Sequence, residues 1–130
     1  MKVTIDQEFW DLFPQAQVVV MTVEGIDNHV DEGKDPYFKD LLDKGVARSK
    51  VFIDDEQFTA SPVVQEWRQA FSKFKTKKGA RSSIEALLKR VSQGREFYPI
   101  NPLVDLYNSV SLAYAIPCGG EDMEKLAGGL

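Results

Sequence analysis

Through most of the chain the apolar residues recur every three or four positions, which is the spacing of one buried helix face. Residues typical of helix starts and stops flank these runs, including the Ser61-Pro62 and Asn101-Pro102 pairs and the stop at Gly94. Ser82 with Glu85 has the spacing of a capping box. The pattern predicts helices over residues 6–13, 37–49, 61–74, 82–93, 101–116 and 121–127, with a tight turn at 117–120.

Two segments have the pattern of strands instead. Lys2–Ile5 alternates and is predicted to be a short edge strand, and Gln15–Val23 contains the β-branched run VVVMTV of a buried strand. Residues 25–35 are polar and predict a loop, while 50–59 have no clear period. Because an isolated pair of strands is only marginally stable, this thin sheet needs a further segment or another chain to complete it.

Composition narrows the class of protein. The chain has 130 residues, of which 43% are hydrophobic, and a formal net charge of −4, as expected of one ordinary domain with a real core. A single cysteine excludes an internal disulfide framework and suggests a reducing compartment. The start MKVTIDQEFW is not a secretory signal, and no apolar run is long enough to span a membrane. We therefore expect a cytoplasmic protein with no membrane partner.

The charge is unevenly distributed along the chain. Residues 68–95 hold nine basic side chains and one acid, a net charge of +8, against seven basic and nineteen acidic side chains elsewhere. The centre of this segment, KFKTKKGAR at 73–81, interleaves cations with Phe74 and ends near a flexible glycine, which suits contact with phosphates. The predicted phosphate contacts are Lys75, Lys77, Lys78 and Arg81. An equally weighted alternative is a solvated connector between two helices.

The predicted helix over 101–116 carries a polar face among apolar residues. Asn101, Asp105 and Asn108 are spaced four and three apart and so share one side of the helix. Burying such groups costs a few kcal/mol unless they are hydrogen-bonded. Helix capping and internal hydrogen bonds are the commoner explanation of this face, and the wall of a pocket, roofed by the turn at 117–120, is the functional one.

Three stretches of the second half are similar to a known family. They are SSIEALLKR at 82–90, INPLVDLYNSVSL at 100–112 and IPCGGEDMEKLAG at 116–128. Together they resemble the tRNA-editing domain of the phenylalanyl-tRNA synthetase beta chain, and more closely the free-standing bacterial relatives of that domain. The positions that match the family pattern are Ile100, Asn101, Val104, Asp105, Asn108, Leu112, Pro117 and Asp122. The resemblance implies an α+β fold, with helices packed around a small mixed sheet and a mainly helical C-terminal half. On this basis residues 1–130 form a single domain, an incomplete copy of the N-terminal part of the family domain.

The resemblance also implies a pocket that accepts the aminoacyl end of a tRNA. Its expected lining is Asn101, Asp105, Asn108, Ser111, Pro117, Cys118, Gly119 and Gly120. Two positions depart from the family: its loop histidine falls on Gly119, and the threonine before the pocket asparagine is Tyr107. We therefore assign no catalytic residue, and whether the chain is an aminoacyl-tRNA deacylase stays open.

Cys118 and His29 are the other candidates for chemistry. A thiol beside a helix start has a lowered pKa, but a cysteine hydrolase also needs a base, and the only histidine lies in the polar loop. We interpret Cys118 as a small packed thiol. The acids around His29 lack ligand spacing, and no nucleotide-binding glycine motif occurs, so the sequence predicts no metal and no cofactor.

These observations predict a tRNA- or aminoacyl-tRNA-binding module that acts in trans. If the module is an enzyme, the expected reaction is the hydrolysis of mischarged tRNA. A second copy of the chain, or a C-terminal continuation of the domain, would complete the sheet. The alternative is a non-enzymatic pocket protein that binds a small amino-acid-like or aromatic ligand without RNA. The basic segment 68–95 distinguishes them, since it is essential for RNA and dispensable for a small ligand.

Overall fold

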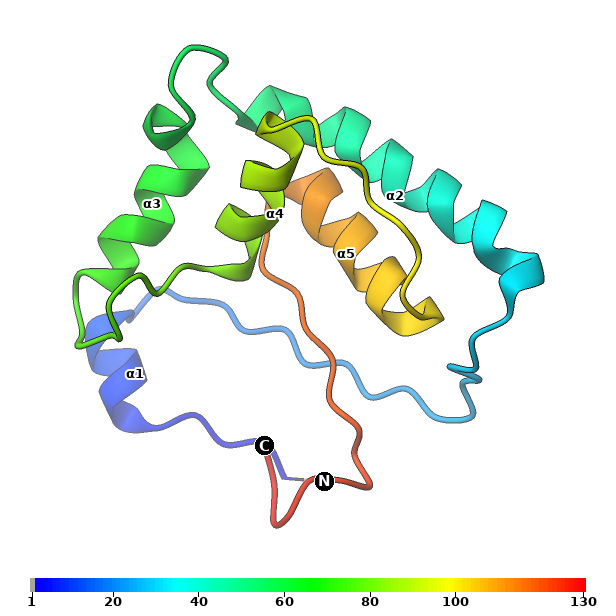
Figure 1. Ribbon diagram of the computed structural model, residues 1–130. Coiled ribbons are helices and arrows are strands. Elements are labelled where there is room, and N and C mark those ends of the chain that lie inside the picture. The colour runs from blue at the N-terminus through cyan, green and yellow to red at the C-terminus, as the bar shows by residue number, and fades with distance from the viewer. Residues whose placement is uncertain (1) are drawn as a thin grey trace. The chain divides into compact units, whose positions relative to one another are not determined.

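The computed structural model describes residues 2–130 as five α-helices and three short 3₁₀ helices joined by irregular segments (Figure 1). The α-helices are α1 (Gln7–Leu12), α2 (Asp35–Ser49), α3 (Pro62–Phe71), α4 (Ser83–Ser92) and α5 (Pro102–Tyr114). The 3₁₀ helices are η1 (Glu32–Lys34), η2 (Lys50–Phe52) and η3 (Phe58–Ala60). The chain divides into two compact units: Asn28–Gly120 is the larger, and the chain up to Asp27 forms the smaller with Glu121–Leu130. The single domain expected from the length stays a prediction.

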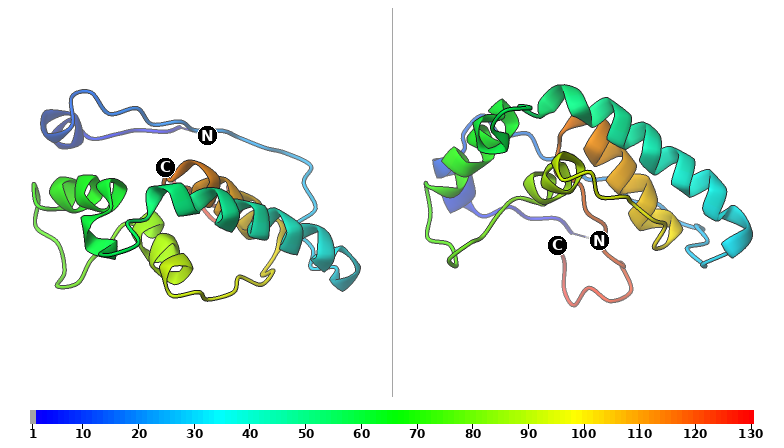
Figure 2. Two further views of the ribbon diagram at one scale, coloured as in Figure 1. Left: turned by 90° about the horizontal axis from the view of Figure 1, so that it is seen from above. Right: turned by 45° about the horizontal axis from the view of Figure 1, so that its top comes forward.

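In the larger unit, α2 and α5 lie side by side and run in the same direction (Figures 1 and 2). A Cβ built on Gly45 of α2 would lie 2.9 Å from the Ser109 carbonyl oxygen and 3.2 Å from the Leu112 Cβ of α5. The two helices therefore approach each other at a distance that only glycine permits. Near their C-terminal ends, the Arg48 guanidinium lies 5.3 Å from the centre of the Tyr114 ring.

Two apolar clusters form the core of this unit, and α4 contributes to both. One consists of Leu42, Phe97 and Leu112 with the half-buried Val46, Leu87 and Val91 around it. The other consists of Ile84, Leu88 and Ala115, surrounded by Phe52, Ile53, Phe58, Val63, Trp67 and Leu87. The predicted apolar faces of the helices thus form the core. From the unassigned residues 50–59, Phe52, Ile53 and Phe58 pack onto it, in and beside the 3₁₀ helices η2 and η3.

Two of the four predicted cap residues, Ser82 and Asn101, make the expected bond at a helix start. Ser82 Oγ accepts the backbone N–H three residues on at 3.3 Å, and Asn101 Oδ1 does the same at 3.0 Å. Ser61 departs from the prediction, because its hydroxyl makes no cap bond and instead accepts the Asp54 N–H at 2.9 Å. Asp6 also precedes its helix without a side-chain cap.

The α+β prediction is wrong: residues 2–130 contain no strand and no sheet. Gln15–Val23 is irregular, and its apolar side chains are exposed, with Val19 at 87% and Met21 at 79% of full exposure. Lys2–Ile5 is not a strand either, although the Thr4 N–H donates to the Leu130 carbonyl at 2.8 Å. A β-branched run favours an extended backbone, but a strand also requires a neighbour that pairs with it. In the described chain, no backbone hydrogen bond joins residues 17–23 to another segment, and Lys2 and Thr4 pair only with Leu130.

Two predictions near the C-terminus are also wrong. Residues 117–120 form no tight turn: after the left-handed Ala115 the backbone runs back along α5, and a Cβ on Gly120 would lie 3.3 Å from Leu103. Between Ala115 and Gly120 the chain passes from the C-terminal end of α5 back to Leu103 near its N-terminal end. Five residues cover the length of this helix only if they are extended, since an extended chain rises about 3.3 Å per residue and a helix about 1.5 Å. The helix predicted over 121–127 is replaced by a turn, because the Asp122 side chain accepts the Glu124 N–H at 3.0 Å and competes with helix formation.

Among residues 2–130, no helix combines the length and the apolar character that crossing a membrane requires.

Candidate functional site

A cavity of about 350 Å³ lies between α3, α4 and the loop that joins them. It is lined by Trp67, Arg68, Phe71, Ser72, Thr76, Lys77, Lys78, Gly79, Ala80, Arg81, Ser82 and Glu85. We call it the α3–α4 cavity. Three of the four predicted phosphate contacts, Lys77, Lys78 and Arg81, belong to this lining, and Lys75 does not.

A three-residue ion-pair cluster forms one wall of the cavity. The Glu85 carboxylate, whose side chain is only 5% exposed, accepts hydrogen bonds from Arg68 at 2.8 Å (Nη2) and 3.2 Å (Nε). Arg81 Nε lies 3.1 Å from the same Glu85 oxygen. The carboxylate therefore holds two half-exposed guanidiniums in place, which is not the role of a capping-box glutamate.

The connecting loop supplies most of the remaining lining of the cavity. Helix α3 ends at Phe71, three residues before the sequence predicts, where the Ser72 hydroxyl donates to the Gln69 carbonyl at 2.6 Å. Further on, the Ala80 N–H donates to the Lys77 carbonyl at 3.0 Å, and Gly79 takes a positive φ of 82° in the turn between them. Because residues 72–79 are all exposed, the lysine side chains reach solvent beside the cavity.

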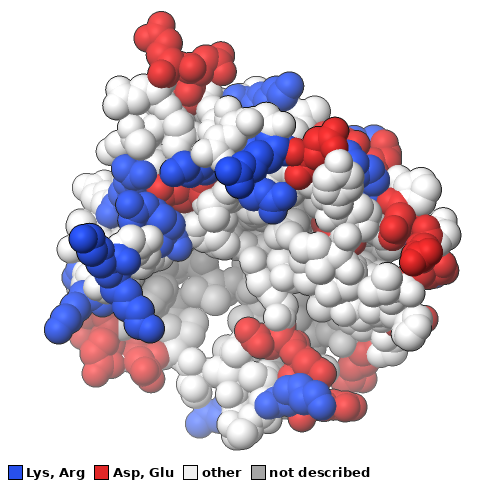
Figure 3. All heavy atoms as spheres, in the orientation of Figure 1, with Lys and Arg blue, Asp and Glu red and all other residues white. Residues whose placement is uncertain are grey.

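The cavity lining is strongly basic. Four cationic side chains face a single carboxylate, which leaves a net charge of +3 on a protein whose total is −4. Figure 3 shows the Lys and Arg side chains gathered over the α3–α4 connection, at the left of the view. A local field of this kind attracts anions within about 10 Å at physiological salt, whatever the total charge.

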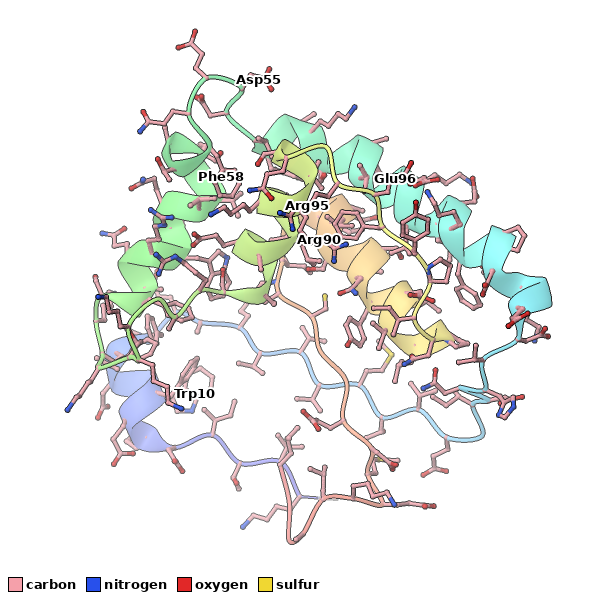
Figure 4. All side chains as sticks on the ribbon, viewed as in Figure 1. Trp10, Asp55, Phe58, Arg90, Arg95 and Glu96 are labelled. Atoms are coloured by element: carbon pink, nitrogen blue, oxygen red, sulfur yellow. The ribbon has the colours of Figure 1, made fainter. Side chains whose placement is uncertain are left out.

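Not every cation of the basic segment is available to a ligand. Arg90, labelled in Figure 4, lies with its guanidinium 4.4 Å from the Phe97 ring centre and donates to the Glu96 carbonyl at 3.1 Å. Its charge thus serves the packing of the segment after α4. Within the basic segment, Arg90 therefore has a different role from the four cations that line the α3–α4 cavity.

The polar face of α5 has a different environment. Asn101 caps the helix, and Asp105 Oδ1 accepts the Ile100 N–H at 2.9 Å. Both residues line a much smaller cavity of about 50 Å³, closed by residues 30–38 together with 99–102. The segment 117–120, which the sequence predicts as its roof, does not contribute to that lining.

Asp105 is almost completely buried, at 1% exposure. Its second oxygen, Oδ2, has no hydrogen-bond partner in the described part of the chain. Burial raises the pKa of this carboxyl above its ordinary 3.8, the Ile100 N–H opposes the shift, and the nearby charge of Asp35 adds to it. Asp105 is thus a desolvated carboxyl beside a space that is large enough for water and far smaller than an ordinary ligand site.

The other predicted pocket residues are not brought together. The Ser111 hydroxyl donates to the Ile116 carbonyl within the α5 C-terminus, and Asn108 is half-buried and lines neither cavity. Pro117, Gly119 and Gly120 lie on the exposed segment that returns along α5. Cys118 is half-buried there, and burial raises the pKa of its thiol. A raised pKa makes the thiolate scarcer, which agrees with a packed thiol rather than a nucleophile.

Sequence reasoning missed Arg68, Trp67 and Phe71 as site residues. Arg68 stands in the basic segment 68–95, and the two aromatics fall on the apolar stripe of the helix that the sequence predicts over 61–74. Their spacing of four places the aromatics on one helix face, and Arg68 follows directly after Trp67. That combination of aromatic and basic residues was the available signal. No group of acids, histidine and cysteine that could hold a metal occurs in residues 2–130.

Comparison with known families and proteins gives one match. The family model of the B3/4 domain matches residues 66–130, half of the chain, from within α3 through α4 and α5 to the C-terminus. No curated protein and no solved structure matches the chain. The match includes every residue of the α3–α4 cavity.

Proposed function

The chain belongs to the B3/4 domain family, the domain of the phenylalanyl-tRNA synthetase beta chain, and from this premise we propose that it is a tRNA-binding module. The RNA-binding surface of the proposal is the α3–α4 cavity and its loop. One observation carries it: Lys77, Lys78 and Arg81, which the sequence marks as phosphate contacts, line a single basic cavity. Lys and Arg that neutralise phosphates supply most of the affinity of such an interface.

The family match also bears on the alternative. A pocket protein for a small amino-acid-like or aromatic ligand, with no RNA partner, is not favoured by membership of a tRNA-synthetase family. The buried Asp105 and Asn101 offer a cavity of only about 50 Å³, well below the roughly 300 Å³ or more of ordinary small-molecule sites.

Charge reversal on the loop tests the proposal. In the double variant Lys77→Glu and Lys78→Glu, we expect tRNA affinity at about 0.1 M salt to fall at least about tenfold, because two phosphate contacts become repulsive. The slope of log affinity against log salt should fall in magnitude by about 1.4 to 1.8, since fewer counterions are released on binding. Filter binding of unmodified tRNA across a salt series measures both quantities.

A matched control carries the same change in net charge on another helix. Lys39 and Lys44 of α2 are lysines in exposed ion pairs with Asp43 and Asp40, and such pairs contribute little to stability. Lys39→Glu with Lys44→Glu should leave tRNA affinity within about twofold of the wild type. If the control loses as much affinity as the loop variant, or the loop variant loses none, the α3–α4 cavity is not the RNA surface.

A more specific version of the proposal is that the chain binds aminoacyl-tRNA and hydrolyses it when the tRNA is mischarged. The test is deacylation of mischarged tRNA by the wild type and by Asn108→Ala, since Asn108 stands at the family's pocket asparagine. A wild-type rate above the uncatalysed one that Asn108→Ala abolishes would support editing in trans. Background rates in both would restrict the function to binding.

A further inference from the structure

The α3–α4 cavity combines two features that a phosphate contact alone does not need. Its volume of about 350 Å³ lies within the range of small-molecule sites, and two of its lining residues are aromatic. We propose that this cavity binds one nucleotide, with its phosphate on the cationic wall and its base against Trp67 and Phe71. The nucleotide is either one unit of a bound RNA strand, which rests on the proposed function, or a free nucleoside monophosphate.

The cationic wall is prepared for an anion before any ligand arrives. Arg68 uses Nε and Nη2 on Glu85, and its Nη1 makes no hydrogen bond to the rest of the described chain. Arg81 Nε lies 3.1 Å from a Glu85 oxygen in an ion pair, and Arg81 Nη1 donates to the Ala80 carbonyl at 2.7 Å, which leaves Nη2. A guanidinium carries five N–H donors in a fixed fork, so each arginine retains donors for a phosphate oxygen.

Glu85 gives this arrangement its rigidity. Its side chain is 5% exposed and contacts both arginines, so neither guanidinium has to be ordered when a ligand binds. Groups held in their bound positions beforehand lose less entropy on association, which raises affinity. One carboxylate between two guanidiniums leaves a net positive charge, and Lys77 and Lys78 add to it from the loop.

The aromatic part of the lining selects a base over a bare anion. Trp67 and Phe71 lie one turn apart on the face of α3 that borders the cavity, and both are half-buried. Stacking of a nucleobase on an aromatic side chain contributes about 1–3 kcal/mol and tolerates any base. Inorganic phosphate would use only the cationic wall, and a nucleoside would use only the aromatic residues.

Direct titration separates these ligands. The sequence has two tryptophans, so Trp10→Phe leaves Trp67 as the only fluorescent indole. We expect AMP to quench Trp67 fluorescence, and both adenosine and inorganic phosphate to bind at least about tenfold more weakly than AMP, as measured by calorimetry on the unmodified chain. AMP that binds no more tightly than phosphate would overturn the proposal, as would no AMP binding at millimolar concentration.

Arginine variants place the ligand in the cavity. Arg81→Gln removes one cationic donor from a 48% exposed side chain and should weaken AMP binding at least about fivefold without loss of helical circular dichroism. Arg95→Gln, with the same charge change at an exposed residue outside the lining, should leave AMP affinity unchanged. Equal losses in the two variants would contradict a site in the α3–α4 cavity.

Binding experiments with RNA distinguish this inference from the proposed function. A short single-stranded RNA that competes with AMP identifies the nucleotide as part of a strand, while AMP binding without competition identifies a free nucleotide. If tRNA binds with the expected dependence on Lys77 and Lys78 but AMP does not bind, the nucleotide site is refuted and the RNA-binding proposal stands. If AMP binds but tRNA does not, the RNA-binding proposal is refuted and the nucleotide site stands.

Discussion

In the α2–α5 pair the helix backbones approach so closely that Gly45 has no room for a Cβ, whereas a cavity of about 350 Å³ opens between α3 and α4. Both pairs contain charged groups that are buried or nearly so. At the α5 N-terminus, Asp105 is bound by a backbone N–H and enclosed. In the α3–α4 pair, Glu85 is equally buried but holds guanidiniums that reach solvent.

The difference shows that a buried charged group in this protein can either stabilise the fold or orient side chains for a ligand. A polar group in a closely packed helix pair is used by the helix itself, and its mutation should change stability. A polar group that orients exposed cations around an open cavity is available to a ligand, and mutations around it should change binding. Substitutions in the closely packed pair can test this separation, and the largest effect is expected at the point of closest approach.

Gly45→Ala should produce the largest loss of stability. The added Cβ would lie 2.9 Å from the Ser109 carbonyl, so α2 and α5 must move apart, and overpacking of this kind costs about 1–3 kcal/mol. Urea unfolding followed by circular dichroism measures the free energy. Gly119→Ala is the control, because a Cβ there meets nothing within 4 Å, and it should be neutral. A Gly45→Ala variant as stable as the control would refute the close approach.

Asn101→Ala should have an intermediate effect. It removes the side-chain oxygen that accepts the Val104 N–H at 3.0 Å, and loss of an N-cap costs about 1 kcal/mol. Asn108→Ala is the matched comparison, because Asn108 makes no such bond within the described chain, and it should cost less. Neither variant should change tRNA affinity at a temperature where both are folded. A loss of affinity in Asn101→Ala would contradict a purely structural role of Asn101 as the helix cap.

The pH dependence of stability at Asp105 is the smallest expected effect. Its pKa is higher in the folded protein than its ordinary 3.8, so the folded state holds the proton more tightly than the unfolded chain does. The contribution of Asp105 to stability is therefore most favourable below pH 3.8 and declines as pH rises through the window up to the raised pKa.

Asp105→Asn keeps an oxygen for the Ile100 N–H and removes this titration. Relative to the wild type, the variant should become more stable as pH rises through that window and level off above it, as measured by urea unfolding from about pH 4 to pH 7. Asp55→Asn, at an exposed position on the loop before η3 (Figure 4), provides the control. A constant difference between Asp105→Asn and the wild type at every pH would exclude the buried, desolvated carboxyl.

The helices were largely predictable because their signals are local. Apolar spacing and cap residues act within a few positions of each other, and Ser82 and Asn101 make the bonds that their positions predict. The same local reasoning failed for Gln15–Val23, since a strand exists only when a distant segment pairs with it. It failed at 121–127 for the opposite reason, because a side chain only two residues away offered the backbone a turn.

The amino-acid sequence by itself determined four of the helix positions in the larger unit, their apolar faces, the family of the chain and the basic character of residues 68–95. Only the tertiary structure decided which cations surround a cavity, which carboxylate orients them, and that Asp105 is enclosed while Arg81 is not. The physical reason is that periodicity and capping are properties of neighbouring residues. Glu85 meets Arg68 across seventeen positions, and such a contact exists only once the helices have packed.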